Sequence, residues 1–198
     1  MFGAIAGALV ATIASRPGPG AAEPHVAHGD GLAARKSGVA QWRDSAPPLL
    51  TTLLQTHSPE RVPLDAAEPS QTRFDALLMD RTTNEIHPLD PRLLAMLRTL
   101  AQRHTLSRIE LVSGYRSPKL NEMLRKKGHH VASHSQHSLG HAVDFRLVEV
   151  DAEKGIDPRK VEAELRALDW DGGIGTYLSA DDWFVHMDVG PNRRWNGQ

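Results

Sequence analysis

The segment SHSQHSLGHAVDF, residues 133–145, constrains this chain more than any other stretch. Five of the eleven histidines fall between residues 129 and 141, just before an alternating run that carries Asp144. Gly140 permits a sharp turn, so the side chains of His137 and Asp144 can reach one point. Imidazole and carboxylate groups are both ligands that zinc accepts. The pattern therefore favours a metal site at the start of a strand.

A hydrolytic zinc site needs three protein ligands and one open position. The chain contains no cysteine, which excludes disulfides, thiolate zinc sites and cysteine nucleophiles. His186 is the best third ligand, because it interrupts the apolar run WFVHMDVG and a buried imidazole needs a partner. The alternative is that these histidines are packed or surface residues, as we expect for His129, His130, His134 and His141.

Strand alternation places Asp188 on the same face as His186, about 6–7 Å further along. We predict that Asp188 is the catalytic general base of a hydrolytic site. The alternative is that its carboxylate does not take part in proton transfer but orients a metal ligand through a hydrogen bond. Asp182 is the rival base, although it falls in an expected turn.

Helix and strand signals alternate along the second half of the chain. Capping residues with Pro at the first position predict helices over 89–104 and 117–128, and an apolar face of Val161, Leu165 and Leu168 predicts a third helix over 157–168. Alternating or apolar runs predict strands over 108–114, 141–148, 172–177 and 183–190. The mixed order indicates an α+β domain with a small, mostly antiparallel sheet and flanking helices.

The first 47 residues have a different composition. Residues 2–13 are small and apolar, which is typical of a signal-peptide core, although no Lys or Arg precedes them. We expect residues 1–14 to be a signal peptide and 15–47 a Pro/Gly/Ala-rich tether, followed by one domain over 48–198. The apolar run is shorter than the about 20 residues of a membrane helix, so no stable membrane span is expected after processing.

The net charge of −1 is ordinary for a globular protein and argues against nucleic acid as a partner. One cation stands out because Arg116 falls between a strand and a capped helix. Its guanidinium can clamp a substrate carboxylate through two hydrogen bonds. The alternative is a surface salt bridge.

Four blocks carry a resemblance to a known family: SGYRSPKLNEMLR, SQHSLGHAVDF, GGIGTY and FVHMDVGPNRRW. In this order they resemble the YcbK-like murein endopeptidases, which are related to D-Ala-D-Ala carboxypeptidases, lysostaphin-type enzymes and hedgehog-like domains. The resemblance covers about residues 74–195 and implies a hedgehog/DD-peptidase-like fold. It also implies a zinc peptidase of the periplasm or cell envelope that acts on peptidoglycan peptides.

The resemblance implies roles for individual residues. His137, Asp144 and His186 match the zinc ligands, and Asp188 matches the acidic residue after the last ligand. The block beside the cleft is matched by Ser113, Tyr115, Arg116 and Asn121, which are the expected substrate-binding residues. Because hedgehog-like domains hold zinc without evident peptidase work, the alternative function is a non-catalytic, zinc-stabilised module that binds the cell wall.

Three departures from the family pattern bear on substrate preference. Gly-Thr-Tyr-Leu at 175–178 stands where the family usually has Gly-Tyr-Tyr-Pro. The connection over 149–160 is longer than usual, and His134 and His141 replace other polar residues.

Overall fold

The computed structural model describes residues 48–127 and 134–197, which form one α+β domain. The expected signal peptide and tether, together with His129 and His130, lie outside the described residues. Within the described residues, no helix is long and apolar enough to cross a membrane. The elements in chain order are β1 (Thr51–Gln55), β2 (Arg61–Leu64), α1 (Gln71–Leu77), α2 (Pro91–Arg103), β3 (Leu106–Ser113), α3 (Pro118–Lys126), the 3₁₀ helix η1 (Gln136–Leu139), β4 (Ala142–Glu149), α4 (Pro158–Ala167), β5 (Gly173–Leu178), β6 (Trp183–Asp188) and β7 (Arg193–Gly197).

All strands belong to one seven-stranded sheet with the order β2-β1-β3-β4-β6-β5-β7. The β1–β3 and β5–β7 pairings are parallel, whereas the other neighbours are antiparallel. The prediction of a small, mostly antiparallel sheet was therefore wrong: the sheet is larger and mixed. The α+β class itself is confirmed.

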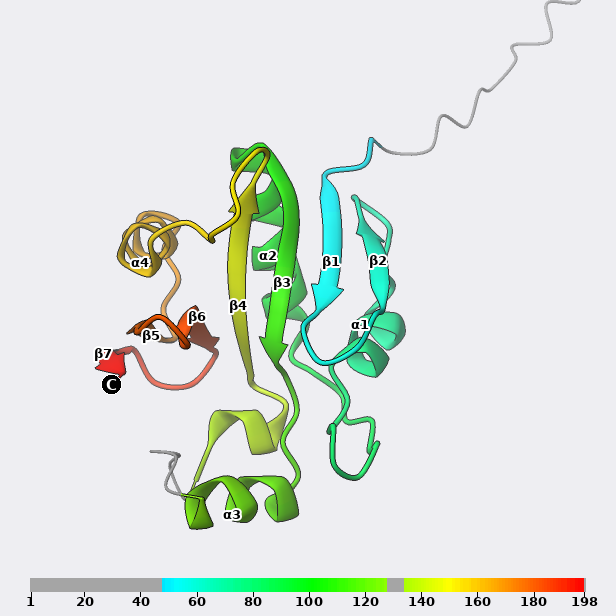
Figure 1. The fold of residues 1–198 in the computed structure, drawn as a ribbon, viewed down its shortest axis with the longest axis vertical. Helices are drawn as coiled ribbons and strands as arrows, with labels where there is room; N and C mark the ends of the chain where they lie inside the picture. Colours follow the sequence, from blue (N-terminus) through cyan, green and yellow to red (C-terminus); the bar gives the residue numbers. More distant parts are fainter. Residues whose placement is uncertain (1–47, 128–133, 198) are drawn as a thin grey trace, which may run out of the picture. The chain divides into compact units, whose positions relative to one another are not determined.

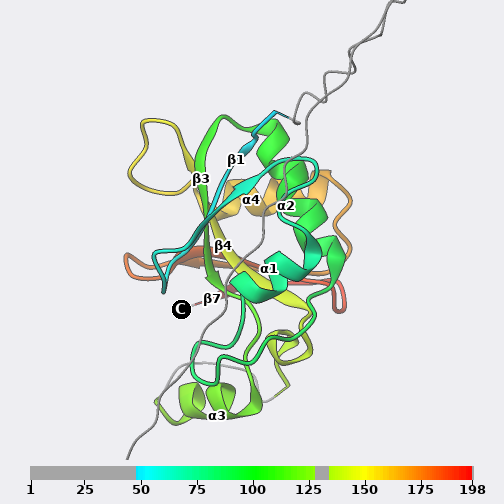
Figure 2. The same cartoon turned by 90° about the vertical axis from the view of Figure 1, so that its right-hand side faces the viewer.

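The sheet has one apolar face and one polar face, because side chains alternate along each strand. On β4, Val143, Phe145 and Leu147 enter the core, whereas Asp144 and Arg146 lie on the opposite face. Figure 2 shows α1 and α2 on one side of β1, β3 and β4. Leucines of α2 fill the core there, which leaves the opposite face of the central strands available for a site.

Capping residues begin the longer helices, at Asp90 and Ser117 as predicted. Asp90, Ser117 and Asp157 each accept a hydrogen bond from a backbone N–H of the first turn, and Pro follows each of them. The cap at Ser117 ends the link from β3 and begins α3, which lies beyond the ends of β3 and β4 (Figure 1). This link carries Arg116.

The turn before β4 depends on Gly140. This residue ends η1 with φ +70°, a left-handed backbone conformation that residues other than glycine rarely adopt. Its carbonyl accepts a hydrogen bond from the N–H of Asp90 at 2.9 Å, which ties the turn to the start of α2. The turn therefore holds His137, in η1, at a fixed place in front of β4.

Candidate metal centre

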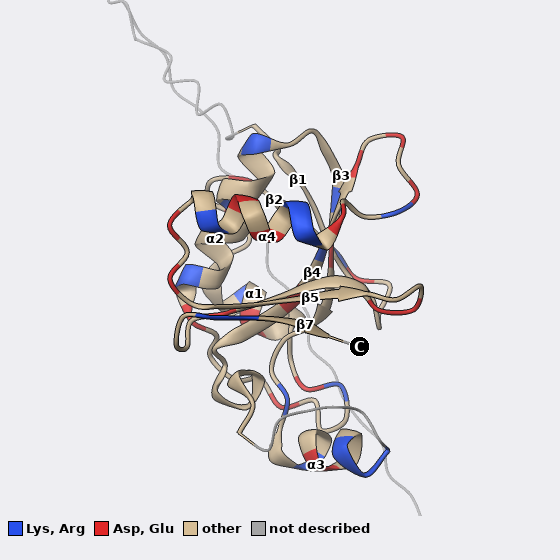
Figure 3. Ribbon diagram, turned by 90° about the vertical axis from the view of Figure 1, so that its left-hand side faces the viewer, with Lys and Arg blue, Asp and Glu red and all other residues tan. Residues whose placement is uncertain are grey.

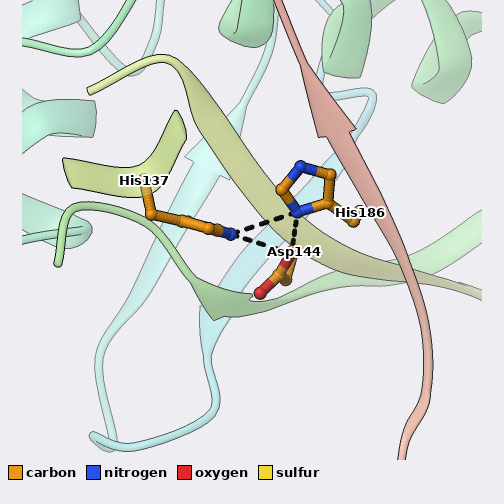
Figure 4. Close-up of side chains that lie close together, drawn as sticks. All are labelled: His137, Asp144 and His186. Atoms are coloured by element: carbon orange, nitrogen blue, oxygen red, sulfur yellow. Dashed lines mark hydrogen bonds and ion pairs between the residues drawn. The ribbon is translucent and has the colours of Figure 1, made fainter. Parts of the chain in front are cut away.

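His137, Asp144 and His186 converge as the sequence predicts (Figure 4). Nε2 of His137 lies 3.1 Å from Nδ1 of His186, and Oδ1 of Asp144 lies 3.2 Å and 2.8 Å from these two nitrogens. All three residues are buried. The three side chains lie close enough together to hold a metal ion, and their role as metal ligands stays a prediction.

The separations of the three ligand atoms fit a tetrahedral zinc site. Zinc bonds of about 2.0–2.1 Å in a tetrahedron place neighbouring ligand atoms about 3.3 Å apart. The three observed separations, 2.8 to 3.2 Å, are slightly shorter. Two imidazoles and one carboxylate also match the donor set of catalytic zinc, in which a fourth position stays open.

The sheet register sets two of these ligands. Asp144 of β4 pairs directly with His186 of β6, and in the same row Ser113 of β3 pairs with Asp144. The row continues through Gly175 of β5 to Trp195 of β7. Because residues opposite one another share a face, this row brings side chains from distant segments to one line across the sheet.

Gly175 lies between His186 and Trp195 in that row. Its missing side chain lets the indole approach, so that the His186 and Trp195 rings lie 5.0 Å apart. A Cβ at this position would lie 2.4 Å from the Trp195 ring. The glycine therefore allows an aromatic side chain to border the imidazole of His186.

Each ligand has a second contact that fixes its orientation. Nδ1 of His137 lies 2.7 Å from the carbonyl oxygen of Gly114, so it carries the proton and leaves Nε2 for a metal. Oδ2 of Asp144 accepts a hydrogen bond from Arg116 at 2.5 Å. Outer contacts of this kind are a regular feature of metal sites.

Asp188 contacts His186 from behind. The two residues share a face of β6 as predicted, but Oδ2 of Asp188 lies 3.0 Å from Nε2 of His186, the nitrogen away from the other ligands. The carboxylate also accepts hydrogen bonds from the backbone N–H groups of Gly173 and Gly190 and from Arg193. It is fully buried and does not line the cavity described below. This placement favours the orienting role over the role of general base, which remains a prediction.

The electrostatics keep two of the three ligands, His137 and Asp144, in states that can bind a metal. Burial and the charge of Arg116 lower the pKa of His137 to about 4, so its imidazole is neutral near pH 7. Burial opposes ionisation of Asp144, but His137 and Arg116 together hold the pKa of this carboxyl well below its usual value. A neutral imidazole and an ionised carboxylate are the forms that coordinate a metal.

A cavity of about 720 Å³ opens onto the three ligands. Its volume is in the usual range for sites that bind small molecules. Ser113 and Arg116, two of the predicted substrate-binding residues, line it, and Nε of Arg116 donates to Oγ of Ser113 at 2.9 Å. Arg116 thus contacts both a ligand carboxylate and the cavity.

Tyr115 and Asn121 do not line the cavity, and their role in binding substrate stays a prediction. The Tyr115 ring stacks on His87 at 4.5 Å, and its hydroxyl lies 3.3 Å from Oε1 of Glu85. Asn121 is buried within α3. These residues shape the link around Arg116, and alternation could not reveal this because the segment lies outside a strand.

Sequence reasoning missed much of the cavity wall. His134 is exposed, as expected, and also lines the cavity, as does Asp182, the rival candidate for the base. The wall also includes residues to which the sequence analysis gave no role in the site: His57, Arg81, Arg146, Tyr177, Phe184, Asp181, Arg193, Arg194 and Trp195. They come from loops and strands that only the folded sheet brings together.

Comparisons with known proteins agree with this geometry. Residues 66–195 match the model of a family described as peptidoglycan L,D-endopeptidase MepK. The chain is 35% identical over 127 residues to the "Probable peptidoglycan L,D-endopeptidase MepK" of Haemophilus influenzae, a match that covers 63% of each chain. It is 32% identical over 155 residues to the "Peptidoglycan L,D-endopeptidase MepK" of Escherichia coli, which covers 75% of this chain and 80% of the relative.

The match to the Haemophilus influenzae relative therefore spans less than two thirds of that protein. No solved structure matches the chain significantly. The family match contains all three converging residues and most of the cavity wall. The predicted resemblance to the murein endopeptidases is thus confirmed, and the chain belongs to the family of peptidoglycan L,D-endopeptidase MepK.

Proposed function

We propose that this protein is an exported zinc peptidase that hydrolyses peptide stems or cross-links of peptidoglycan. The observation that carries the proposal is the convergence of His137, Asp144 and His186 in the wall of a cavity large enough for a peptide segment. The family supports the substrate class, because its relatives are described as peptidoglycan L,D-endopeptidases. We extend that description to this chain and propose cleavage of an L,D bond.

Zinc bound here would lower the pKa of a water molecule toward about 7 and polarise the carbonyl of the scissile bond. The residues of the chain supply positioning around that chemistry. His137 is oriented by the Gly114 carbonyl, His186 by Asp188, and Asp144 by Arg116. Since Arg116 also lines the cavity, we propose that its guanidinium holds an oxygen of the substrate.

Two residues, Asp188 and Asp182, are candidates for the general base. Asp188 was the sequence-based candidate, but its carboxylate is buried behind His186. Asp182 lines the cavity and is exposed, so its carboxylate is accessible to water and substrate. We therefore propose that Asp188 fixes the tautomer of His186 and that Asp182 is the first residue to test as base.

Mass spectrometry of muropeptides tests the function directly. Zinc-loaded protein should convert cross-linked muropeptides into shorter products with one peptide bond broken. His137→Ala should carry little zinc and release no product, whereas His141→Ala should keep both properties. His141 is a suitable control because it lies four residues from His137 and its Nδ1 lies 3.3 Å from Oε1 of Gln136, which is not one of the three ligands.

Two results would contradict the proposal. Intact muropeptides after incubation with zinc-loaded protein would favour the alternative of a non-catalytic module that binds the cell wall. Full zinc content in His137→Ala would remove this residue from the metal site.

A further inference from the structure

Five arginines line the cavity, and four of them are paired with carboxylates of the protein itself. The pairs are Arg116–Asp144, Arg146–Glu110, Arg193–Asp188 and Arg194–Glu162. Figure 3 shows that acidic and basic residues are interspersed along the elements. A paired guanidinium can still donate hydrogen bonds through its other N–H groups, but its charge is partly offset, so it attracts an anionic ligand less strongly than an unpaired one.

Arg81 is different. Among residues 48–127 and 134–197, no carboxylate forms an ion pair with its guanidinium. Its Nη1 instead lies 2.7 Å from Nε2 of His57, which also lines the cavity. An arginine can only donate, so this ring nitrogen accepts and the imidazole is neutral. Arg81 therefore lines the cavity without an ion-pair partner among the described residues, although Asp181 and Asp182 line the same cavity.

His57 is exposed, but desolvation by neighbouring atoms and the charge of Arg81 both lower the pKa of this histidine. The imidazole thus stays neutral at pH 7 and acts as an acceptor that steadies the guanidinium. It does not add a second positive charge that would repel Arg81.

The loop that carries Arg81 is fixed by its neighbour Asp80. One oxygen of this buried carboxylate accepts hydrogen bonds from the N–H groups of Thr82 and Thr83 at 2.7 and 2.8 Å. The other oxygen accepts from the N–H of Ser117 at 2.6 Å, next to Arg116. The backbone on either side of Arg81 is therefore tied to the same link that positions Arg116.

The loop that carries His57 is also anchored. The N–H of Thr56 donates to the carbonyl oxygen of Leu111 in β3 at 3.0 Å. Two anchored loops thus hold the Arg81–His57 pair in the wall of the cavity. Preorganised donors bind a ligand with less loss of conformational entropy than mobile ones.

We propose that Arg81, steadied by His57, is a subsite that binds a free carboxylate of the peptide stem, away from the scissile bond. The inference rests on the proposed function and deepens it by naming the chemistry of the substrate that the cavity selects. Peptidoglycan stems are rich in carboxylates, and a guanidinium binds a carboxylate through two parallel hydrogen bonds. The cleft should therefore prefer stems with free carboxylates over stems in which these groups are amides.

Calorimetry with two peptides tests the subsite. The probes are a stem tripeptide with all carboxylates free and the same tripeptide with all of them converted to amides. The zinc-loaded wild type should bind the free acid more tightly, and Arg81→Gln should reduce that preference about tenfold, as expected for a charge-assisted bidentate contact. His57→Gln keeps an acceptor for Arg81 and should reduce the preference less.

Arg61→Gln is the matched control, because Arg61 is an exposed arginine of β2 that does not line the cavity. It should leave the preference unchanged, and zinc content should be equal in all variants. An Arg81→Gln protein that keeps the wild-type preference would overturn the subsite.

The binding measurement separates this inference from the proposed function. A protein that binds the acid through Arg81 but cuts no muropeptide would retain the subsite and refute the peptidase. A protein that cuts muropeptides while Arg81→Gln leaves the preference unchanged would retain the peptidase and refute the subsite.

Discussion

Replacing Asp188 by asparagine distinguishes an orienting carboxylate from a general base. Oδ1 accepts from the N–H groups of Gly173 and Gly190 at 3.1 and 2.8 Å, and Oδ2 accepts from Arg193 and His186 at 2.8 and 3.0 Å. An amide has one oxygen, so whichever way it turns, its NH₂ group meets two donors. The substitution therefore preserves the volume of the side chain but breaks half of its contacts.

The magnitude follows from these contacts. Hydrogen bonds to a charged group contribute about 1.5–3 kcal/mol each. The Arg193 side chain is 46% exposed, so its contact is screened by water and counts for less. We expect Asp188→Asn to lower the free energy of unfolding of the metal-free protein by about 2–4 kcal/mol.

The effect on the metal is separate. With Asp188 present, Nε2 of His186 donates its proton to a carboxylate, which leaves Nδ1 free to coordinate. Without that acceptor the tautomer is no longer fixed, and zinc affinity should fall about 10- to 100-fold. Competition with a chromophoric chelator measures the affinity, and urea unfolding measures the stability.

Activity at saturating zinc then decides the role of Asp188. If Asp188 only orients His186, excess zinc should restore most of the rate of muropeptide cleavage. A rate that stays about 10²–10⁴-fold low while zinc is fully bound would refute this reasoning and make Asp188 the base. Asp182→Asn is the matched variant, because it removes a cavity-lining carboxylate without contacting His186.

Two further predictions concern the loops that hold the site. Gly140→Ala should lower the free energy of unfolding by about 2 kcal/mol or more and weaken zinc binding. The reason is that φ is +70° and an added Cβ would lie 2.2 Å from the Pro88 carbonyl oxygen. Unchanged thermal unfolding and unchanged zinc titration would contradict this prediction. Burial opposes ionisation of Asp80, but its hydrogen bonds with Ser117, Thr83 and Thr82 lower the pKa below the usual value. The stability that this carboxylate contributes is therefore present above about pH 4 and is lost as the pH falls through the lowered pKa. Asp80→Asn should be less stable at pH 7 by about 1–3 kcal/mol and should lose less on acidification, which urea midpoints at pH 7, 4 and 3 would measure.

Local patterns predicted the helices and strands that carry the site. Caps such as Asp90 and Ser117 act within one turn, so they can be recognised from the sequence alone. His137, Asp144 and His186 could also be proposed from the sequence, because Asp144 and His186 interrupt largely apolar strands and His137 lies in a cluster of histidines.

Long-range pairing limited the rest. The parallel β1–β3 and β5–β7 pairs join segments with no shared local signal, and β7 is short and largely polar. The position of Asp188 shows a different limit. Alternation fixed the face of the strand that it occupies, but only the side-chain conformation of His186 decides which ring nitrogen the carboxylate contacts.

The direct pairing of Asp144 with His186 makes metal binding a check on correct folding. If β4 and β6 paired with a shift of one residue, one of these two side chains would move to the apolar face and the ligand pair would be lost. A metal ion can therefore bind tightly only to chains in which the strands have found the native alignment. Binding would stabilise the correctly aligned chains and shift the folding equilibrium toward them. Supply of the ion during folding should therefore raise the yield of native protein as well as its activity.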